Sequence, residues 1–241
     1  MQVRVFKDAQ AVAKAAAMIF AAQLAEKSDS VLGLATGSTP VETYRKMIEL
    51  YNEGQMDFSK VKSYNLDEYV GLGPEHECSY RYFMQEQLFN HINIRPENTF
   101  VPSGVADNLD QVGLAYDEAV RAAGGVDLQL LGIGNNGHIG FNEPDDHFTS
   151  ATHVVNLTES TIKANTRFFK SESEVPRQAI SKGVGTIMSA RKILLLALGE
   201  AKAQAVRDTV KGHITPRVPA SVLQLHPNAI ILLDEAAASK L

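Results

Sequence analysis

Residues Leu130–Pro144 read LLGIGNNGHIGFNEP, an apolar strand that runs directly into a glycine-rich loop. The loop displays Asn136, His138 and Glu143 within eight residues. Glycine adopts backbone conformations that other residues resist, so such a loop can turn tightly and approach a ligand closely. Histidine and glutamate there are candidates for proton transfer. A surface turn that merely carries polar residues is the alternative.

Apolar runs of strand length recur outside this stretch. Continuous ones occur at Ser30–Ala35, Ile193–Leu198 and Ala229–Leu233, as expected for parallel strands covered on both faces. Further strands are predicted at 3–6, 61–66, 99–101, 126–133 and 152–157. Helices are predicted at 8–27, 41–52, 79–91, 108–123, 159–169, 200–210 and 235–241. The alternation predicts one α/β domain over residues 1–241, with a doubly wound, mainly parallel sheet and helices on both faces.

Composition narrows the function classes. The formal net charge of −5 and the lack of a Lys/Arg cluster do not indicate a nucleic-acid partner. Cys78 is the only cysteine, which excludes an internal disulfide and a multi-cysteine metal site, and the histidines lack metal-ligand spacing. The N-terminus lacks the apolar core of a signal peptide, and no apolar run is long enough to span a bilayer. We therefore expect a cytoplasmic protein with no membrane or metal partner.

Polar clusters follow several predicted strands, at the sheet edge where ligands of such folds bind. After the second strand, Thr36, Gly37, Ser38 and Thr39 lead into Pro40 and a helix. Thr39 suits the N-cap, with Glu42 at capping-box spacing. A helix N-terminus binds phosphate through its free N–H groups and positive dipole end, and the hydroxyls add donors. A well-capped helix without a ligand is the alternative.

A phosphate also favours nearby cations, and two are candidates. Arg167 lies in NTRFF, and Lys202 lies in LGEAK directly after a predicted strand. Lysine in the first turn of a helix opposes the helix dipole, a cost that a bound anion would offset. Solvated surface positions are the alternative for both.

The glycines Gly132, Gly134 and Gly137 match the dinucleotide fingerprint G-x-G-x-x-G after a strand. That fingerprint also requires a helix to open at the third glycine. HIGFNEP follows instead, without helical periodicity. The sequence therefore does not favour a nicotinamide cofactor.

Asp67 and Glu68 form an acidic pair at the end of another predicted strand. Such a pair can cap a helix or lie in a solvated turn. Asp67 at the ligand-binding edge of the sheet can instead act as a general base.

Seven motifs occur together in this order: LATGSTP, NLDEYVG, GIGNNGHIGFNEP, NTRFF, GVGTIMSA, LGEAKA and LQLHP. Together they resemble the glucosamine-6-phosphate deaminase family over nearly the whole chain. The resemblance implies a Rossmann-like sheet and conversion of glucosamine 6-phosphate and water to fructose 6-phosphate and ammonia without a cofactor. It also implies a place in the catabolism of amino sugars such as N-acetylglucosamine.

The resemblance assigns roles residue by residue. His138, with Glu143 as its companion, opens the sugar ring, and Asp67 moves the proton from C2 to C1. The phosphate is held by the TGST residues together with Arg167 and Lys202.

Two departures from the regulated members of that family have consequences. Those enzymes have aspartate where this chain has Asn136, which can still accept a hydrogen bond but adds no negative charge. We expect His138 to hold its proton less tightly as a result. The segment after the FNEP motif contains the acidic residues Asp145 and Asp146, and it has His153 and Val155 at positions that are basic in those enzymes. The C-terminal end is also shorter. These differences predict no activation by N-acetylglucosamine 6-phosphate.

Other readings stay open at this point. A related lactonase or sugar-phosphate isomerase can share the fold, as can a sugar-phosphate-sensing module. A sensor, however, has no need of Asp67, His138 and Glu143 together, and the chain leaves no room for a DNA-binding domain before its first strand. Both a monomer and self-association are compatible with the sequence.

Overall fold

A seven-stranded parallel sheet forms the centre of the computed structural model, which describes residues 1–241. Every neighbouring pair of its strands is parallel, so their carboxyl ends share one edge. In spatial order the strands are β1 (Gln2–Phe6), β10 (Ala229–Asp234), β9 (Lys192–Ala197), β6 (Leu128–Leu131), β2 (Val31–Leu34), β3 (Lys62–Asn65) and β5 (Thr99–Phe100). The predicted doubly wound, mainly parallel sheet is confirmed.

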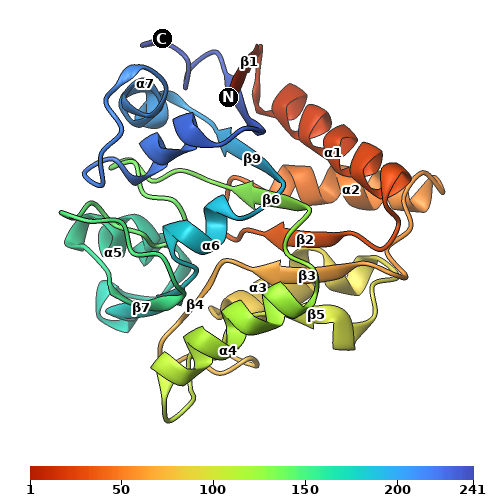
Figure 1. Cartoon of the computed structure of the whole chain (residues 1–241), viewed down its shortest axis with the longest axis horizontal. Helices are drawn as coiled ribbons and strands as arrows, with labels where there is room; N and C mark the ends of the chain where they lie inside the picture. The colour runs from red at the N-terminus through yellow and green to blue at the C-terminus, as the bar shows by residue number, and fades with distance from the viewer.

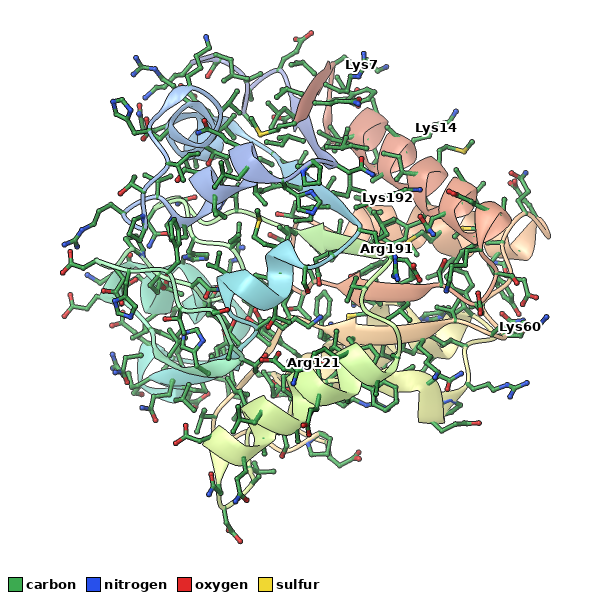
Figure 2. The ribbon with its side chains drawn as sticks, viewed as in Figure 1. Lys7, Lys14, Lys60, Arg121, Arg191 and Lys192 are labelled. Atoms are coloured by element: carbon green, nitrogen blue, oxygen red, sulfur yellow. The ribbon has the colours of Figure 1, made fainter.

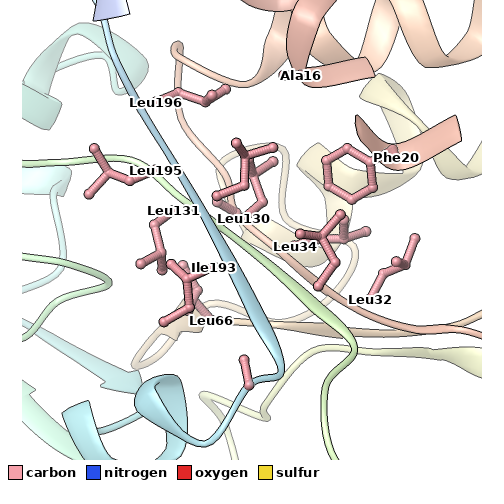
Figure 3. Close-up of a cluster of buried hydrophobic side chains, with 14 of the residues drawn as sticks. Ala16, Phe20, Leu32, Leu34, Leu66, Leu130, Leu131, Ile193, Leu195 and Leu196 are labelled. Atoms are coloured by element: carbon pink, nitrogen blue, oxygen red, sulfur yellow. The ribbon is translucent and has the colours of Figure 1, made fainter. Parts of the chain in front are cut away.

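The three central strands β9, β6 and β2 are buried on both faces, as the continuous apolar sequences of β9 and β2 predict; β6 carries Gln129 among its leucines. Figure 3 shows their side chains in one cluster, where Leu130 and Leu34 meet Phe20 of the first helix. Each such side chain contributes about 1.5–3 kcal/mol when it leaves water. This packing fixes the strand ends that carry the polar loops.

Helices cover both faces of the sheet. Figure 1 shows α1 and α2 together on one side, with α4 and α6 on the other, the arrangement that right-handed crossovers produce when the strand order reverses. The helices are α1 (Ala9–Glu26), α2 (Val41–Asn52), α3 (Tyr80–Gln87), α4 (Leu109–Ala122), α5 (Glu159–Asn165), α6 (Val184–Met188) and α7 (Ala203–Lys211). Short 3-10 turns are η1 (Phe89–His91), η2 (Pro96–Asn98), η3 (Thr166–Phe168), η4 (Glu172–Glu174), η5 (Glu200–Lys202) and η6 (Pro219–Leu225). None of the helices could cross a membrane.

A second, antiparallel sheet stands beside the first. It consists of β4 (Asp67–Tyr69), β8 (Gln178–Ser181) and β7 (His153–Asn156) in that order. Aromatic rings of Tyr69, Tyr80, Phe141 and Phe169 pack on one another next to it. The sequence predicted β7 but not β8, and treated DEY as the end of the preceding strand, because neither DEY nor QAIS alternates apolar and polar residues.

Two local predictions were wrong. Pro40, not Thr39, holds the N-cap position of α2, and no side chain caps this helix. Glu42 instead accepts from Gln10 Nε2 at 3.0 Å and pairs with Arg45, so the predicted capping box does not form. Residues 235–241 form turns rather than a helix, since so short a segment gains too few hydrogen bonds to offset helix nucleation.

Candidate active site

The loop that follows β6, residues 132–144, is here called the histidine loop. His138 Nδ1 lies 3.2 Å from Glu143 Oε2, and Asn136 Nδ2 donates to the same oxygen at 2.6 Å. Thr158 donates to Glu143 Oε1 at 3.2 Å, and Thr161 also donates to it. Although burial raises the pKa of Glu143, hydrogen bonds and charge from His138, followed by bonds from Thr161 and Asn136, lower it to about 2. Glu143 is therefore an anion that orients the imidazole through Nδ1, while Nε2 makes no hydrogen bond to the chain.

Gly134 explains the false dinucleotide fingerprint. A Cβ at this position would lie 2.5 Å from Cε1 and Nε2 of His138, so only glycine leaves room for the imidazole. No helix begins at Gly137, and the next helix, α5, starts at Glu159. The glycines of this loop seat a histidine rather than a pyrophosphate.

Asn136 contacts the histidine in a way that the sequence did not predict. Its Oδ1 accepts from the backbone N–H of His138 at 3.2 Å, while its Nδ2 bonds Glu143. Its side chain therefore holds the turn and the carboxylate, not the imidazole ring.

Asp67 begins β4, pairs in register with Ser181 of β8, and is only 6 % exposed. The histidine loop passes over it at Gly140, where φ is +56° and a Cβ would lie 3.7 Å from Asp67 Oδ2. No group of the chain donates a hydrogen bond to this carboxylate within the distance and angle limits of such a bond. Burial, then the charge of Glu68, raise its pKa to about 8, against the lowering effect of Lys182. A largely buried carboxylate with a raised pKa is a stronger base than a solvated one, as abstraction of a proton from carbon requires.

Glu68 has a different role from its neighbour. It accepts backbone N–H bonds from Tyr69 and Tyr80 at 2.8 Å and from Arg81 at 2.9 Å. Burial raises the pKa of Glu68, whereas these three bonds lower it. Of the two structural readings of the acidic pair, capping of a helix applies to Glu68, whose carboxylate accepts N–H bonds at the start of α3, whereas Asp67 caps no helix.

A cationic cluster forms at the TGST loop, Thr36–Thr39, which follows β2. Arg167 Nη2 donates to Ser38 Oγ at 3.0 Å. Burial, and then the positive charge of Arg167, lower the pKa of Lys202. Gly37 has a φ of +90°, which turns the loop, while Thr36 and Thr39 are partly exposed beside it.

Neither cation of this cluster has a carboxylate partner. Arg191 and Lys192, which Figure 2 labels at the start of β9, show the contrast: they pair with Asp127 and Glu26, each at 2.9 Å. Cations without an acidic partner are suited to bind an anion such as a phosphate.

The structure thus brings the predicted residues to the carboxyl edges of β2, β3, β6 and β9. Asn136, His138 and Glu143 are in direct contact, and so are Ser38 and Arg167. Sequence reasoning missed Thr158 and Thr161, which support Glu143, and Lys182, a lysine with no exposed surface. The Thr-x-x-Thr spacing at the start of a helix could have identified the two threonines, but no local sequence pattern distinguishes Lys182.

The family described as glucosamine-6-phosphate isomerases/6-phosphogluconolactonase matches residues 7–232. A glucosamine-6-phosphate deaminase of Clostridioides difficile (strain 630) is 57% identical over 241 residues, which cover 100% of this chain and 97% of that protein. A solved structure of a monomeric glucosamine-6-phosphate deaminase has a TM-score of 0.98 and 44% identity, and each chain is covered completely. The 6-phosphogluconolactonase of Trypanosoma brucei has a TM-score of 0.78 at 19% identity, covering 100% of this chain and 98% of its own, so its likeness concerns the fold.

Proposed function

The chain belongs to the glucosamine-6-phosphate isomerase/6-phosphogluconolactonase family, and we propose that it is a deaminase acting on D-glucosamine 6-phosphate. The reaction takes up one water and yields D-fructose 6-phosphate and ammonia, in the catabolism of amino sugars in the cytoplasm. The observation that carries this proposal is a buried base, Asp67, and an oriented histidine, His138, on the sheet edge that also carries two unpaired cations.

The first step opens the sugar ring. His138 takes the proton of the anomeric hydroxyl through Nε2 and delivers a proton to the ring oxygen, as C1–O5 breaks and C1 becomes an aldehyde. Glu143 keeps the imidazole in one orientation and stabilises its protonated form, because it is charged and bonded to Nδ1. Asn136 fixes Glu143 and the backbone of His138 from the other side.

The second step moves a proton between carbons. Asp67 removes the proton from C2 of the open chain, which gives an enolamine, and a proton is returned to C1, which leaves an imine at C2. Its burial supports this role, because a carboxylate without hydrogen-bond donors gains most from taking a proton. Water then adds to C2, the C–N bond breaks, and ammonia leaves a ketone behind.

The phosphate anchors the substrate far from the reacting carbons. Ser38 and Arg167, which already contact each other, and Lys202 supply the charge and donors, with Thr36, Gly37 and Thr39 completing the loop. Binding energy gained there positions C1 and C2 against Asp67 and His138.

A substrate comparison tests the proposal. The protein is incubated with glucosamine 6-phosphate, glucosamine and 6-phosphogluconolactone, and ammonia, fructose 6-phosphate and acid release are measured. We expect equal amounts of ammonia and fructose 6-phosphate from the first substrate and far slower turnover of glucosamine, which lacks the phosphate. Lactone hydrolysis without ammonia release would assign the chain to the lactonase reaction, and binding of the sugar phosphate without turnover would assign it to sensing.

A further inference from the structure

Asp234 is a carboxylate at the ligand-binding edge of the sheet that the proposed reaction does not use. It is the last residue of β10, beside the place where the parallel neighbour β9 runs into its own turn. Oδ1 and Oδ2 each accept from the backbone N–H of Gly199 at 3.0 Å, and Oδ1 also accepts from the N–H of Ala237 at 2.8 Å. A side chain at the end of one strand therefore holds the turn that follows another.

Gly199 gives this turn a backbone conformation that only glycine adopts readily. Its φ is +82° and its ψ is 157°, a region in which other residues are strained. An added Cβ would meet no atom within 4 Å, so the backbone requires the glycine and lack of space does not. Neither η5 nor α7, which follow the turn, has a side-chain cap of its own. Asp234 supplies the side chain that fixes this turn.

The same turn carries Lys202. The carbonyl of Gly199 accepts from the backbone N–H of Lys202 at 3.1 Å, which closes the 3-10 turn η5. Lys202 is partly buried, and its ammonium forms no hydrogen bond or salt bridge within the chain. Because no other side chain holds this ammonium, its position depends on the backbone that carries it, and so on the contact between Asp234 and Gly199.

A purely structural role is the alternative for Asp234. It also begins the turns at the C-terminal end, because Oδ1 accepts from Ala237 and its carbonyl accepts from the N–H of Ala238 at 3.1 Å. The two bonds to Gly199 lie outside those turns, however, and reach the segment before Lys202. The two roles can be separated by experiment, since only one of them acts through Lys202.

We propose that Asp234 is a positioning residue that acts through Gly199, holding the turn after β9 so that the Lys202 ammonium is placed to bind the substrate phosphate. The inference rests on the proposed function, because it takes Lys202 as part of the phosphate site. It explains why a carboxylate from β10 binds a turn that contributes nothing to β10 itself.

The test is a double-mutant cycle on KM for glucosamine 6-phosphate in the full chain. Asp234→Ala should raise KM about tenfold, and less than Lys202→Ala does, with kcat kept within a few-fold, since a misplaced binding group weakens substrate positioning. In the Lys202→Ala background, Asp234→Ala should raise KM by less than about twofold, because the group through which it acts is already gone. An equal rise in both backgrounds would show a purely structural role and overturn the proposal.

Two more variants sharpen the cycle. Asp234→Asn keeps an oxygen at the place of Oδ1, which accepts from both Gly199 and Ala237, so its KM should stay close to that of the wild type. An Asp234→Asn protein as impaired as Asp234→Ala would contradict the hydrogen-bonding role. Asp57→Ala is the matched control: it removes a carboxylate that accepts from the N–H of Ser59 at 3.0 Å in the loop before β3, at the opposite edge of the sheet, and should leave KM unchanged.

Folding and phosphate binding are measured alongside. Thermal unfolding reports whether Asp234→Ala is folded, and Gly199→Ala replaces it if it is not, because the added Cβ disturbs only the backbone of the turn. Calorimetry with inorganic phosphate needs no turnover. If the wild type binds phosphate but releases no ammonia, the proposed function fails, yet weaker phosphate binding by the variant still supports the inference, and unchanged binding contradicts it. A wild type that neither binds phosphate nor converts glucosamine 6-phosphate would overturn both.

Discussion

Replacing Asn136 with aspartate changes a hydrogen bond of the histidine loop into a repulsion between two carboxylates. Asn136 Nδ2 now donates to Glu143 Oε2 at 2.6 Å, and an aspartate would place a second carboxylate oxygen there. The variant loses one of the bonds that lower the pKa of Glu143 and gains a like charge against it. His138 Nδ1, 3.2 Å from Glu143 Oε2, then faces two carboxylates.

The magnitude follows from the distance. Two unit charges about 3 Å apart repel by roughly 5 kcal/mol at an effective dielectric constant near 20, which corresponds to nearly 4 pH units before the side chains relax. Because relaxation and uptake of a shared proton reduce this figure, we expect the pKa of the Glu143 carboxyl to rise from about 2 by roughly 2 units. We also expect His138 to hold its proton more tightly in the variant than in the wild type.

The assay is an NMR titration of the wild type, Asn136→Asp and Asn136→Ala. Carbon signals of the Glu143 carboxyl and ring signals of His138 report the two groups separately. Asn136→Ala removes the hydrogen bond without adding charge, so it separates the two contributions and should raise the pKa of Glu143 by less. If neither Glu143 nor His138 titrates differently in Asn136→Asp, the electrostatic account of this loop is refuted.

Three further predictions concern binding, stability and regulation. Arg167→Ala and Lys202→Ala should each raise KM for glucosamine 6-phosphate about 10- to 100-fold with a smaller effect on kcat, since a charge-assisted hydrogen bond contributes about 1.5–3 kcal/mol. Steady-state kinetics measure this, and an equal rise in KM for unphosphorylated glucosamine would contradict it. Burial raises the pKa of Asp67 to about 8, so the ionisation of this carboxyl lowers the stability of the folded chain as the pH rises from about 4 to about 8. The free energy of unfolding of Asp67→Asn should therefore increase relative to the wild type across that interval, by at most about 1.4 kcal/mol for each unit of the pKa shift. Denaturant unfolding of both proteins at pH 5 and pH 8 tests this, and a difference that does not depend on pH would contradict it. Kinetics should be hyperbolic with or without N-acetylglucosamine 6-phosphate, and a sigmoidal curve that this compound makes hyperbolic would show the regulation we do not expect.

The large sheet was predictable because the composition of its central strands reflects their burial. The apolar runs Ser30–Ala35 and Ile193–Leu198, typical of strands covered on both faces, contain β2 and most of β9, and the helix at Val41–Asn52 was predicted with its observed ends. The second sheet was only partly predicted, because Asp67–Tyr69 and Gln178–Ser181 are defined by each other rather than by their own residues. Pairing across more than a hundred residues leaves no local pattern.

In the candidate site, too, residues close together in sequence could be predicted, and contacts between distant segments could not. His138 and Glu143 could be identified because they share one glycine-rich loop, and their contact is now observed, while their catalytic roles stay a prediction. The burial of Lys182 could not be predicted, since it lies in an ordinary SKGVG segment and its contacts, Tyr64 and Gln129, are far away in sequence. Sequence therefore located candidate residues that share one loop better than buried residues brought together by the fold.

The central claim is that Asp67 is the base that moves the C2 proton during deamination. The most direct test is the rate of ammonia and fructose 6-phosphate formation from glucosamine 6-phosphate by the wild type and by Asp67→Asn, with substrate binding measured separately. Loss of a positioned general base predicts a decrease in kcat of about 10²- to 10⁴-fold while the variant still binds the sugar phosphate. An Asp67→Asn protein that forms both products at the wild-type rate would contradict the account.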